Sequence, residues 1–332
     1  MTTRAASQRQ AALVYNPIKV DETRLRATVR DLSKMAGWVH PAFYPTTLED
    51  AGQLATAQAL SRGVDAVMVA GGDGTVRAVA EAMAGTGVPL AILPSGTGNL
   101  LARNLGLPLG DPSDMISAAF GGFTHAIDIG WATLTRADGE ATEHAFVVLA
   151  GIGLDADMIA NTRSDLKRSV GWIAYVDGAA RSLAGAKPFR SVYQIEDRRL
   201  HSTKVHSILF ANCGTLPAGI ALIPDASIAD GIMDVAVIQP TGLLGWLGVW
   251  RKIWWDNSVL RRFRAGRRVL ERRGRNASVH YLRGTTAEAA ASSPTPIELD
   301  GDEFGEAVRI RCRIDPGALL LALPTDHPVD AL

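Results

Sequence analysis

Short apolar runs alternate with helix-like segments over the first 125 residues of the chain. Four runs have the length and composition of buried strands, at residues 11–15, 38–44, 65–70 and 88–93. The segments between them carry apolar residues at helical spacing, at residues 25–35, 48–60 and 76–83. Strands that alternate with helices are typical of a parallel sheet with helices on its faces, so the pattern predicts an α/β domain.

The pattern changes after Phe123. Strand-like runs then follow one another closely, at residues 125–134, 145–150, 191–196, 205–212, 233–239, 278–282 and 308–314. Helical patterns are mainly at residues 170–183 and 243–255, and the Ala-, Ser-, Thr- and Pro-rich residues 285–296 predict a mobile loop. The sequence therefore predicts a first domain at residues 1–125, to which residues 315–332 return, and a second, mostly antiparallel β domain at residues 126–314.

The composition excludes several classes of partner. Lys and Arg together number 34 and Asp and Glu together number 34, so no net charge favours nucleic acid. The N-terminus lacks the apolar core of a secretion signal, and no apolar run is long enough to span a bilayer. Cys213 and Cys312 lie far apart in apolar runs, which favours buried free thiols in a reducing compartment. We expect a cytoplasmic protein, soluble or peripheral at the inner face of the membrane.

The third apolar run ends in Gly71-Gly72-Asp73-Gly74-Thr75, and a helical pattern begins immediately afterwards. A strand that ends in glycines and opens a helix brings backbone N–H groups and a helix N-terminus to one place, and both favour a phosphate group. The carboxylate of Asp73 would repel that phosphate unless a cation lay between them. The motif therefore indicates a nucleotide that binds together with magnesium.

A second glycine-rich turn, Pro-Ser-Gly-Thr-Gly-Asn, follows the fourth apolar run. Gly96 allows the backbone to approach a ligand closely, Thr97 offers a hydroxyl group, and Asn99 is a good cap for the helix that follows. Ligands of parallel sheets bind at the carboxyl ends of the strands. Both turns fall there, together with Asn16 and Thr46, so we expect these residues to form one site.

The two turns resemble those of the diacylglycerol kinase catalytic-domain family, which includes bacterial diacylglycerol kinases and the sphingosine and ceramide kinases. The resemblance rests on Gly-Gly-Asp-Gly-Thr at 71–75 and Pro-Ser-Gly-Thr-Gly-Asn-Leu-Leu-Ala-Arg-Asn at 94–104, and it continues at 222–226, 229–235 and 298–302. It covers nearly the whole chain. It implies a Rossmann-like nucleotide domain, an antiparallel β-sandwich second domain, and transfer of the γ-phosphate of ATP to a lipid hydroxyl, with diacylglycerol as the default acceptor.

The resemblance also implies which residues bind the nucleotide and the metal. The implied nucleotide-binding residues are Asn16, Pro17, Thr46, Gly71, Gly72, Asp73, Gly74, Thr75, Arg77, Gly96, Thr97 and Asn99. Asp73 would hold a magnesium ion (Mg2+) through water. A second, structural magnesium would be bound by Asp230 and the backbone carbonyls of Ser227 and Ile232, which agrees with the preference of magnesium for oxygen ligands.

The catalytic base is predicted in the turn Asp300-Gly301-Asp302. Phosphoryl transfer to a hydroxyl needs a carboxylate that orients the alcohol and accepts its proton. The family usually has Asp-Gly-Glu here, whereas this chain has the shorter Asp302 followed by Glu303. Either Asp302 reaches the alcohol after a small backbone shift, or Glu303 takes over. Asp302, Asp300 and Asp73 form the predicted catalytic set.

Two further features leave alternatives open. Arg77 stands where many relatives have Asn, and it either adds positive charge near the phosphates or points into solvent. Residues 242–255 are rich in Trp and residues 251–275 are rich in Arg. These segments suit either docking on an anionic membrane surface or a core-packed helix followed by a solvated basic strand.

Two rival functions share parts of the pattern. An NAD kinase also carries Gly-Gly-Asp-Gly-Thr on a similar fold, but the second turn and residues 230–234 favour the lipid kinase. Asp302 in place of Glu is also compatible with a non-catalytic nucleotide- or lipid-binding module. No Gly-x-x-x-x-Gly-Lys-Ser/Thr occurs, so a P-loop enzyme is excluded. We expect a lipid substrate and no nucleic acid as partners, and the sequence leaves a homodimer open.

Overall fold

The computed structural model describes residues 9–153, 188–216, 220–221, 223, 226–240 and 279–328. The chain forms two compact units. The first contains the residues up to Ile129, Ile228–Gly231 and the chain from Asp315 onward, and the second contains Gly130–Ser227 and Ile232–Ile314. The predicted helices at 170–183 and 243–255 and the Trp- and Arg-rich segments at 242–275 lie outside the described residues.

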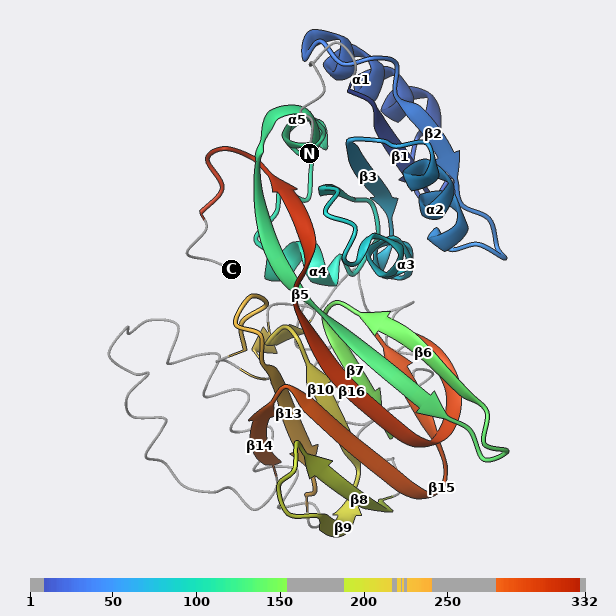
Figure 1. The fold of residues 1–332 in the computed structure, drawn as a ribbon, viewed down its shortest axis with the longest axis vertical. Coiled ribbons are helices and arrows are strands. Elements are labelled where there is room, and N and C mark those ends of the chain that lie inside the picture. Colours follow the sequence, from blue (N-terminus) through green and yellow to red (C-terminus); the bar gives the residue numbers. More distant parts are fainter. Residues whose placement is uncertain are drawn as a thin grey trace, which may run out of the picture. The chain divides into compact units, whose positions relative to one another are not determined.

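The first unit is built on a parallel sheet (Figure 1). Its strands are β1 (Ala11–Tyr15), β2 (Ala42–Pro45), β3 (Ala66–Gly71) and β4 (Leu90–Pro94). They lie in the order β2-β1-β3-β4, and Leu321, near the end of β16 (Asp302–Leu323), pairs with Leu90 of β4. β1 and β3 are buried along their whole length, as expected for central strands that are covered on both faces.

Helices cover both faces of this sheet. They are α1 (Glu22–Met35), α2 (Gln53–Ser61), α3 (Asp73–Met83), α4 (Leu100–Asn104) and α5 (Ser113–Gly121). The strand order reverses direction after β2, and parallel crossovers are right-handed, so α1 lies on the face opposite to α2 and α3. α1 packs against α5, and α2 packs against α3. α1 buries Leu25, Val29 and Ser33, which form one stripe along the helix.

The second unit consists of antiparallel strands. They are β6 (Ala141–Phe146), β7 (Leu149–Ile152), β8 (Phe189–Ile195), β9 (His201–Val205), β10 (Ser207–Ala211), β13 (Met233–Ile238), β14 (Val279–Gly284), β15 (Thr286–Leu299), and the short pair β11 (Thr215–Leu216) and β12 (Ile220–Ala221). The main order is β14-β13-β10-β7-β15-β16, with β8 between β15 and β9, and β6 beside β5 (Phe123–Thr135). Parallel α/β structure followed by antiparallel β structure confirms the fold class predicted from the sequence.

The prediction of a mobile loop at residues 285–296 is wrong, because residues 286–296 lie in β15. The strand pairs with β16 on one side and with β7 and β8 on the other. Ala287 and Ala289 are buried, so their small side chains belong to the packed interior. Ser292, Ser293 and Pro294 fall at a register shift between Ala290 and Thr295, and Pro296 falls at a second shift before Glu298. Pairing on two sides overrides the weak strand propensity of this segment.

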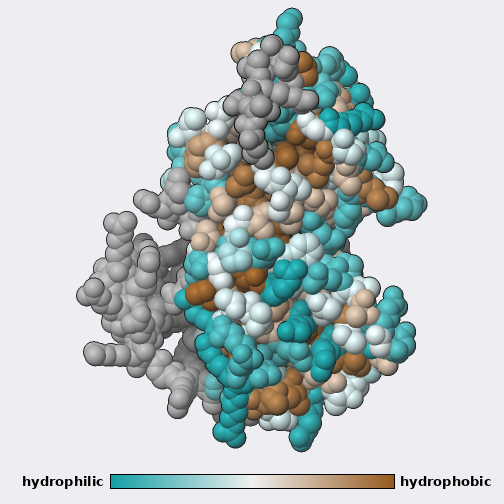
Figure 2. Space-filling model, viewed as in Figure 1, coloured by the Kyte–Doolittle hydropathy of each residue, from teal (hydrophilic) through white to brown (hydrophobic). Residues whose placement is uncertain are grey.

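Burial agrees with the sequence at the two cysteines. Cys213 and Cys312 are buried free thiols. Burial disfavours the thiolate and raises the pKa of both thiols well above the ordinary value. On the face drawn in Figure 2, apolar residues occur in small groups between polar ones. Within the part of the chain that the structure describes, no helix combines the length and the apolar character needed to cross a membrane.

Candidate functional site

Four loops of the first unit lie at the carboxyl edge of its sheet, each following one of the strands β1 to β4. The backbone hydrogen bonds at this edge run from Asn16 N–H to Ala70 C=O at 2.8 Å, from Thr46 N–H to Tyr15 C=O at 2.8 Å, and from Ser95 N–H to Gly71 C=O at 3.2 Å. Thr46 is buried, whereas Pro17 and Thr97 are exposed. The structure therefore brings together the loops that hold the predicted nucleotide-binding residues.

The N-terminus of α3 begins in the first glycine-rich turn. Gly72 is its N-cap residue and has extended backbone, so no side chain caps the helix from this position. The N–H groups of Gly74 and Thr75 donate to none of the described residues. The first amides of a helix carry partial positive charge and need acceptors. The start of α3 is therefore ready to bind an anion such as a phosphate group.

At each of the other helices of the described first unit, an aspartate carboxylate accepts from backbone N–H groups at the N-terminus. In α1, Asp21 accepts from Arg24 N–H at 3.1 Å, and in α5, Asp111 accepts from Ser113 N–H at 2.9 Å. In α2, Asp50 accepts from Leu54 and Ala55 N–H, at 3.0 and 2.9 Å. At α4, Asp73 accepts from Asn99 and Leu100 N–H, at 3.0 and 2.5 Å. Each carboxylate occupies the place that an external anion would need. Among these helices, α3 alone has no side chain that accepts from its N-terminal amides.

The two glycine-rich turns touch at positions where only glycine fits. A Cβ atom on Gly96 would lie 2.7 Å from the Cα atom of Gly72, and one on Gly71 would lie 2.6 Å from the Cβ atom of Thr75. A Cβ atom on Gly98 would collide with the carboxylate of Asp73. These separations are too short for carbon or oxygen neighbours. The glycines therefore allow the second turn to pack directly on the open end of α3.

Asp73 joins the two turns, and Asn99 has a different role from the one expected. The Oδ1 and Oδ2 atoms of Asp73 accept from Leu100 and Asn99 N–H, so Asp73 supplies the cap that we expected from Asn99. The Asn99 side chain instead accepts from Gly96 N–H at 2.9 Å and donates to Gly96 C=O at 3.0 Å, which closes the turn. Carboxylate oxygens are ligands that magnesium prefers. This arrangement fits magnesium held through water.

Arg77 lies one helical turn after Asp73, on the same side of α3. Its side chain is buried, with 6% of the residue exposed, and its Nη1 atom lies 3.7 Å from Oε2 of Glu81. The alternative in which Arg77 points into solvent is therefore wrong. The other alternative, a positive charge near the phosphates, stays a prediction.

Asp128 is a buried carboxylate that the sequence reasoning missed. It lies within β5 and joins two distant segments of the first unit. Gly231 N–H donates to Oδ2 at 2.6 Å, Gly317 N–H donates to Oδ1 at 2.8 Å, and Asp128 N–H donates to Ile228 C=O at 2.8 Å. The available signal was an aspartate between two isoleucines of a strand, because a buried charge must find partners. Asp128 fixes the turn that contains the predicted metal ligand Asp230.

The predicted structural metal site has one carboxylate and two carbonyl donors. Asp230 is exposed, and Ser227 and Ile232 are half-buried. Within the described ranges, no group of three or more His, Cys, Asp or Glu side chains could hold a metal ion. The set of oxygen donors nevertheless fits magnesium, which keeps several waters and needs few protein ligands. The assignment of Ser227, Asp230 and Ile232 stays a prediction.

In the second unit, the carboxylate of Asp300 holds the chain between β6 and β7. Its Oδ2 atom accepts from Val147 N–H and its Oδ1 atom from Val148 and Leu149 N–H, each at 2.8 Å. Asp300 is buried, so these charge-assisted bonds have a structural role. Asp302 is half-buried at the start of β16, and Glu303 is exposed. The role of base stays a prediction for either of these two residues.

Two family models match the chain. The model of the diacylglycerol kinase catalytic domain matches residues 10–132, and that of the YegS C-terminal NAD kinase beta sandwich-like domain matches residues 147–323. The chain is 30% identical to a Pseudomonas putida protein named "Probable lipid kinase YegS-like", over 97% of both chains. It is 33% identical to a Mycobacterium tuberculosis protein named "Diacylglycerol kinase", over 55% of this chain and 58% of that protein.

Solved structures share the fold at low sequence identity. A diacylglycerol kinase from Bacillus anthracis has a TM-score of 0.64 at 17% identity, over 97% of this chain and 98% of that one. A yeast NADH kinase bound to NADH has a TM-score of 0.52 at 12% identity, over 98% and 86% of the two chains.

The family models and the relatives show a kinase with an α/β part and a β-sandwich part. The chain belongs to the diacylglycerol kinase catalytic-domain family and is a lipid kinase, as its motifs predicted. Kinases of this family use ATP.

Proposed function

We propose that this lipid kinase transfers the γ-phosphate of magnesium–ATP to the hydroxyl group of diacylglycerol. The observation that carries the proposal is the open N-terminus of α3, on which the second glycine-rich turn packs. The choice of acceptor is supported by the name of the Mycobacterium tuberculosis relative, "Diacylglycerol kinase".

The nucleotide phosphates bind to the amides of Gly74 and Thr75, with the Thr97 hydroxyl group completing the site. Asp73 would hold magnesium through water, and the ion would supply positive charge beside the phosphates. Preorganised amides and a metal ion stabilise the charge that develops during phosphoryl transfer, and positioning supplies most of the remaining rate enhancement. The carboxylate of Asp73 is suited to this because two amides already fix its orientation.

Asp302 accepts the proton of the lipid hydroxyl group, and Glu303 is the alternative base. The support for Asp302 is its half-buried carboxylate, which follows the turn that Asp300 anchors. The decisive comparison is Asp302→Asn with Glu303→Gln. Loss of kcat in Asp302→Asn, with an unchanged KM for ATP, supports Asp302. Loss of kcat in Glu303→Gln alone contradicts it and assigns the base to Glu303.

Asp230 and the carbonyls of Ser227 and Ile232 bind a structural magnesium. The support is the exposed carboxylate of Asp230 in a turn whose backbone Asp128 fixes. Thermal unfolding with and without magnesium tests this site. Magnesium should raise the unfolding temperature of the wild type more than that of Asp230→Asn. An equal rise in both proteins contradicts the assignment.

Residues 242–275 dock the enzyme on an anionic membrane surface, at the cytoplasmic face. The support is the sequence alone, since Trp-rich residues precede an Arg-rich run. Basic residues near such a surface contribute roughly 1 kcal/mol each. Replacing several of these arginines by glutamine should weaken binding to anionic vesicles without lowering the unfolding temperature. Unchanged vesicle binding contradicts this docking.

An acceptor panel tests the proposed reaction. The purified protein is incubated with labelled ATP, magnesium and, separately, diacylglycerol, ceramide, sphingosine, phosphatidylglycerol or NAD, with the lipids in mixed micelles. Label in diacylglycerol is the expected result. Label mainly in another lipid overturns the choice of acceptor, and label in NAD alone overturns the lipid-kinase reaction. Binding of ATP without any labelled product favours a non-catalytic binding module.

A further inference from the structure

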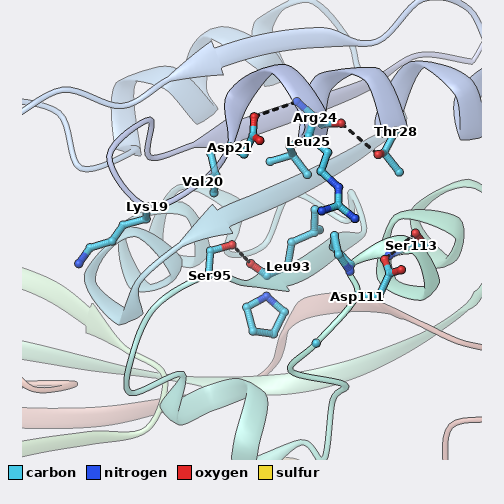
Figure 3. A pocket seen from close by; sticks show the side chains of 13 residues that line it. Lys19, Val20, Asp21, Arg24, Leu25, Thr28, Leu93, Ser95, Asp111 and Ser113 are labelled. Carbon is cyan, nitrogen blue, oxygen red and sulfur yellow. Dashed lines mark hydrogen bonds between the residues drawn. The ribbon is translucent and has the colours of Figure 1, made fainter.

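A cavity of about 530 Å³ opens in the first unit between α1, the end of β4 and the loop that precedes α5 (Figure 3). Its volume lies within the range of roughly 300–1,000 Å³ that is typical of small-molecule sites. The lining includes Pro94 and Ser95 but no residue of the Gly71–Thr75 turn, and it includes neither Thr46 nor Thr97. The cavity therefore adjoins the candidate nucleotide site through Pro94 and Ser95 but leaves out the start of α3.

Two cationic residues line this cavity, and both are exposed. Lys19 and Arg24 both line it, and Figure 3 shows Arg24 extending from α1 toward Asp111 and Ser113. Neither cation makes a side-chain hydrogen bond or ion pair with the described residues. A guanidinium group offers several donors in a planar fork, which matches a phosphate or carboxylate group.

The acidic side chains of the lining are already engaged. Asp21 accepts from Arg24 N–H, and Asp111 accepts from both N–H and Oγ–H of Ser113. These bonds, first of all the one from the Ser113 hydroxyl group, lower the pKa of Asp111, and the charge of Arg24 contributes to the same effect. The lining holds two cations and two carboxylates, so its formal charges balance. The carboxylates accept hydrogen bonds from the described residues, whereas the side-chain donors of the two cations have no acceptor among them.

The other lining residues indicate what the uncharged part of a ligand would contact. Val20, Leu25 and Leu93 contribute apolar surface. The hydroxyl groups of Thr28 and Ser95 donate to backbone carbonyls, at 3.0 and 2.9 Å, so they are not donors toward the cavity. An occupant that satisfies the site carries an anionic head toward Lys19 and Arg24 and a small body against the apolar walls.

We propose that this cavity is a second anion site, which binds a phosphomonoester group carried on a small body. The group could belong to a soluble organic phosphate or to a lipid headgroup, because both present the same oxygens to Arg24 and Lys19. The proposal does not depend on the reaction proposed above, since it rests on the cavity and on Lys19 and Arg24, whose side chains donate to none of the described residues.

Equilibrium dialysis of the full chain tests the proposal. Labelled glycerol 3-phosphate represents the soluble source and labelled dihexanoyl phosphatidate the lipid source. A saturating, non-hydrolysable magnesium–ATP analogue is present throughout, so that the nucleotide site is filled. The wild type should bind one equivalent of at least one probe, and which probe binds identifies the source. No binding of either probe to the nucleotide-saturated protein overturns the proposal.

Two variants and a matched control locate the bound probe. Arg24→Gln removes the fork and should weaken binding about tenfold or more, as expected for loss of charge-assisted hydrogen bonds. Thr28→Phe fills the cavity and should weaken binding to a similar extent. Lys34→Gln removes an exposed charge from the last turn of the same helix, outside the cavity, and should leave binding unchanged. Equal binding by all three variants, or equal binding of uncharged glycerol, overturns the site.

Discussion

The N-termini of α3 and α4 lie side by side at the carboxyl edge of one sheet, yet their first amides differ in whether they have a hydrogen-bond acceptor. The first amides of α4 donate to the carboxylate of Asp73, whereas Gly74 and Thr75 at the start of α3 have no acceptor among the described residues. Asp73 therefore caps the N-terminus of α4 and lies beside the N-terminus of α3, whose first amides have no such cap. The difference shows how the fold keeps one anion site while it removes the competing ones.

Replacement of Asp73 should have the largest effect on kcat, because Asp73 both caps α4 and supplies the negative charge beside the start of α3. Asp73→Asn keeps the size of the side chain but loses the charge that orients magnesium, and it presents an amide N–H group toward a backbone N–H. We expect kcat to fall about 100-fold or more, as for other losses of preorganised charge. The matched control is Asp50→Asn, which removes the corresponding carboxylate at α2. An equal loss of kcat in both variants contradicts a special role for Asp73.

Gly96→Ala should have the next largest effect, because it separates the second turn from the start of α3. The new Cβ atom would lie 2.7 Å from Gly72 Cα and 3.1 Å from Asn99 Oδ1. We expect the Kd for magnesium–ATP to rise about tenfold or more, since distorted amides no longer fit the phosphates. Gly121→Ala is the control, because a Cβ atom there meets nothing within 4 Å. Calorimetric titration gives both values, and similar values would contradict the packing argument.

Asp300→Asn should destabilise the second unit while leaving the α3 site intact. Three amides lose a charged acceptor in a buried place, which costs about 2–3 kcal/mol. For a unit of this size we expect the unfolding temperature to fall by roughly 5–10 °C. Calorimetry measures the fall, and titration with magnesium–ATP should give an unchanged Kd. A changed Kd with unchanged stability would contradict the structural role of Asp300.

Glu22→Gln should have the smallest effect, at the N-terminus of α1. Glu22 accepts from Tyr15 Oη and pairs with Arg26, both at 2.6 Å, and these bonds, with that from Tyr15 first, lower the pKa of Glu22. Its stabilising contribution is therefore present above the ordinary value of 4.5 and is lost as the pH falls through the lowered pKa. Urea unfolding should show a weaker loss of stability in acid for Glu22→Gln than for Glu49→Gln, an exposed control.

The sequence predicted the parts of this site that depend on local pattern. Apolar runs that end in glycine placed the two turns at strand ends, and the parallel order of the strands brought the turns together. The partners of Asp73 and Asp128 were not predictable in this way. Asp73 bonds Leu100, and Asp128 bonds Gly231 and Gly317, so these contacts join residues far apart in the sequence. β15 was missed for the same reason, because its strand conformation comes from neighbours on both sides.

The most direct test of the α3 site is amide NMR on protein labelled with [15N]glycine and [15N]threonine, titrated with magnesium–ADP. The amides of Gly72, Gly74 and Thr75 should shift most. The amide of Gly52 at the start of α2, where Asp50 already accepts from the first turn, should stay in place. Shifts at Gly52 without shifts at Gly74 and Thr75 would contradict the assignment of the phosphate site to the N-terminus of α3.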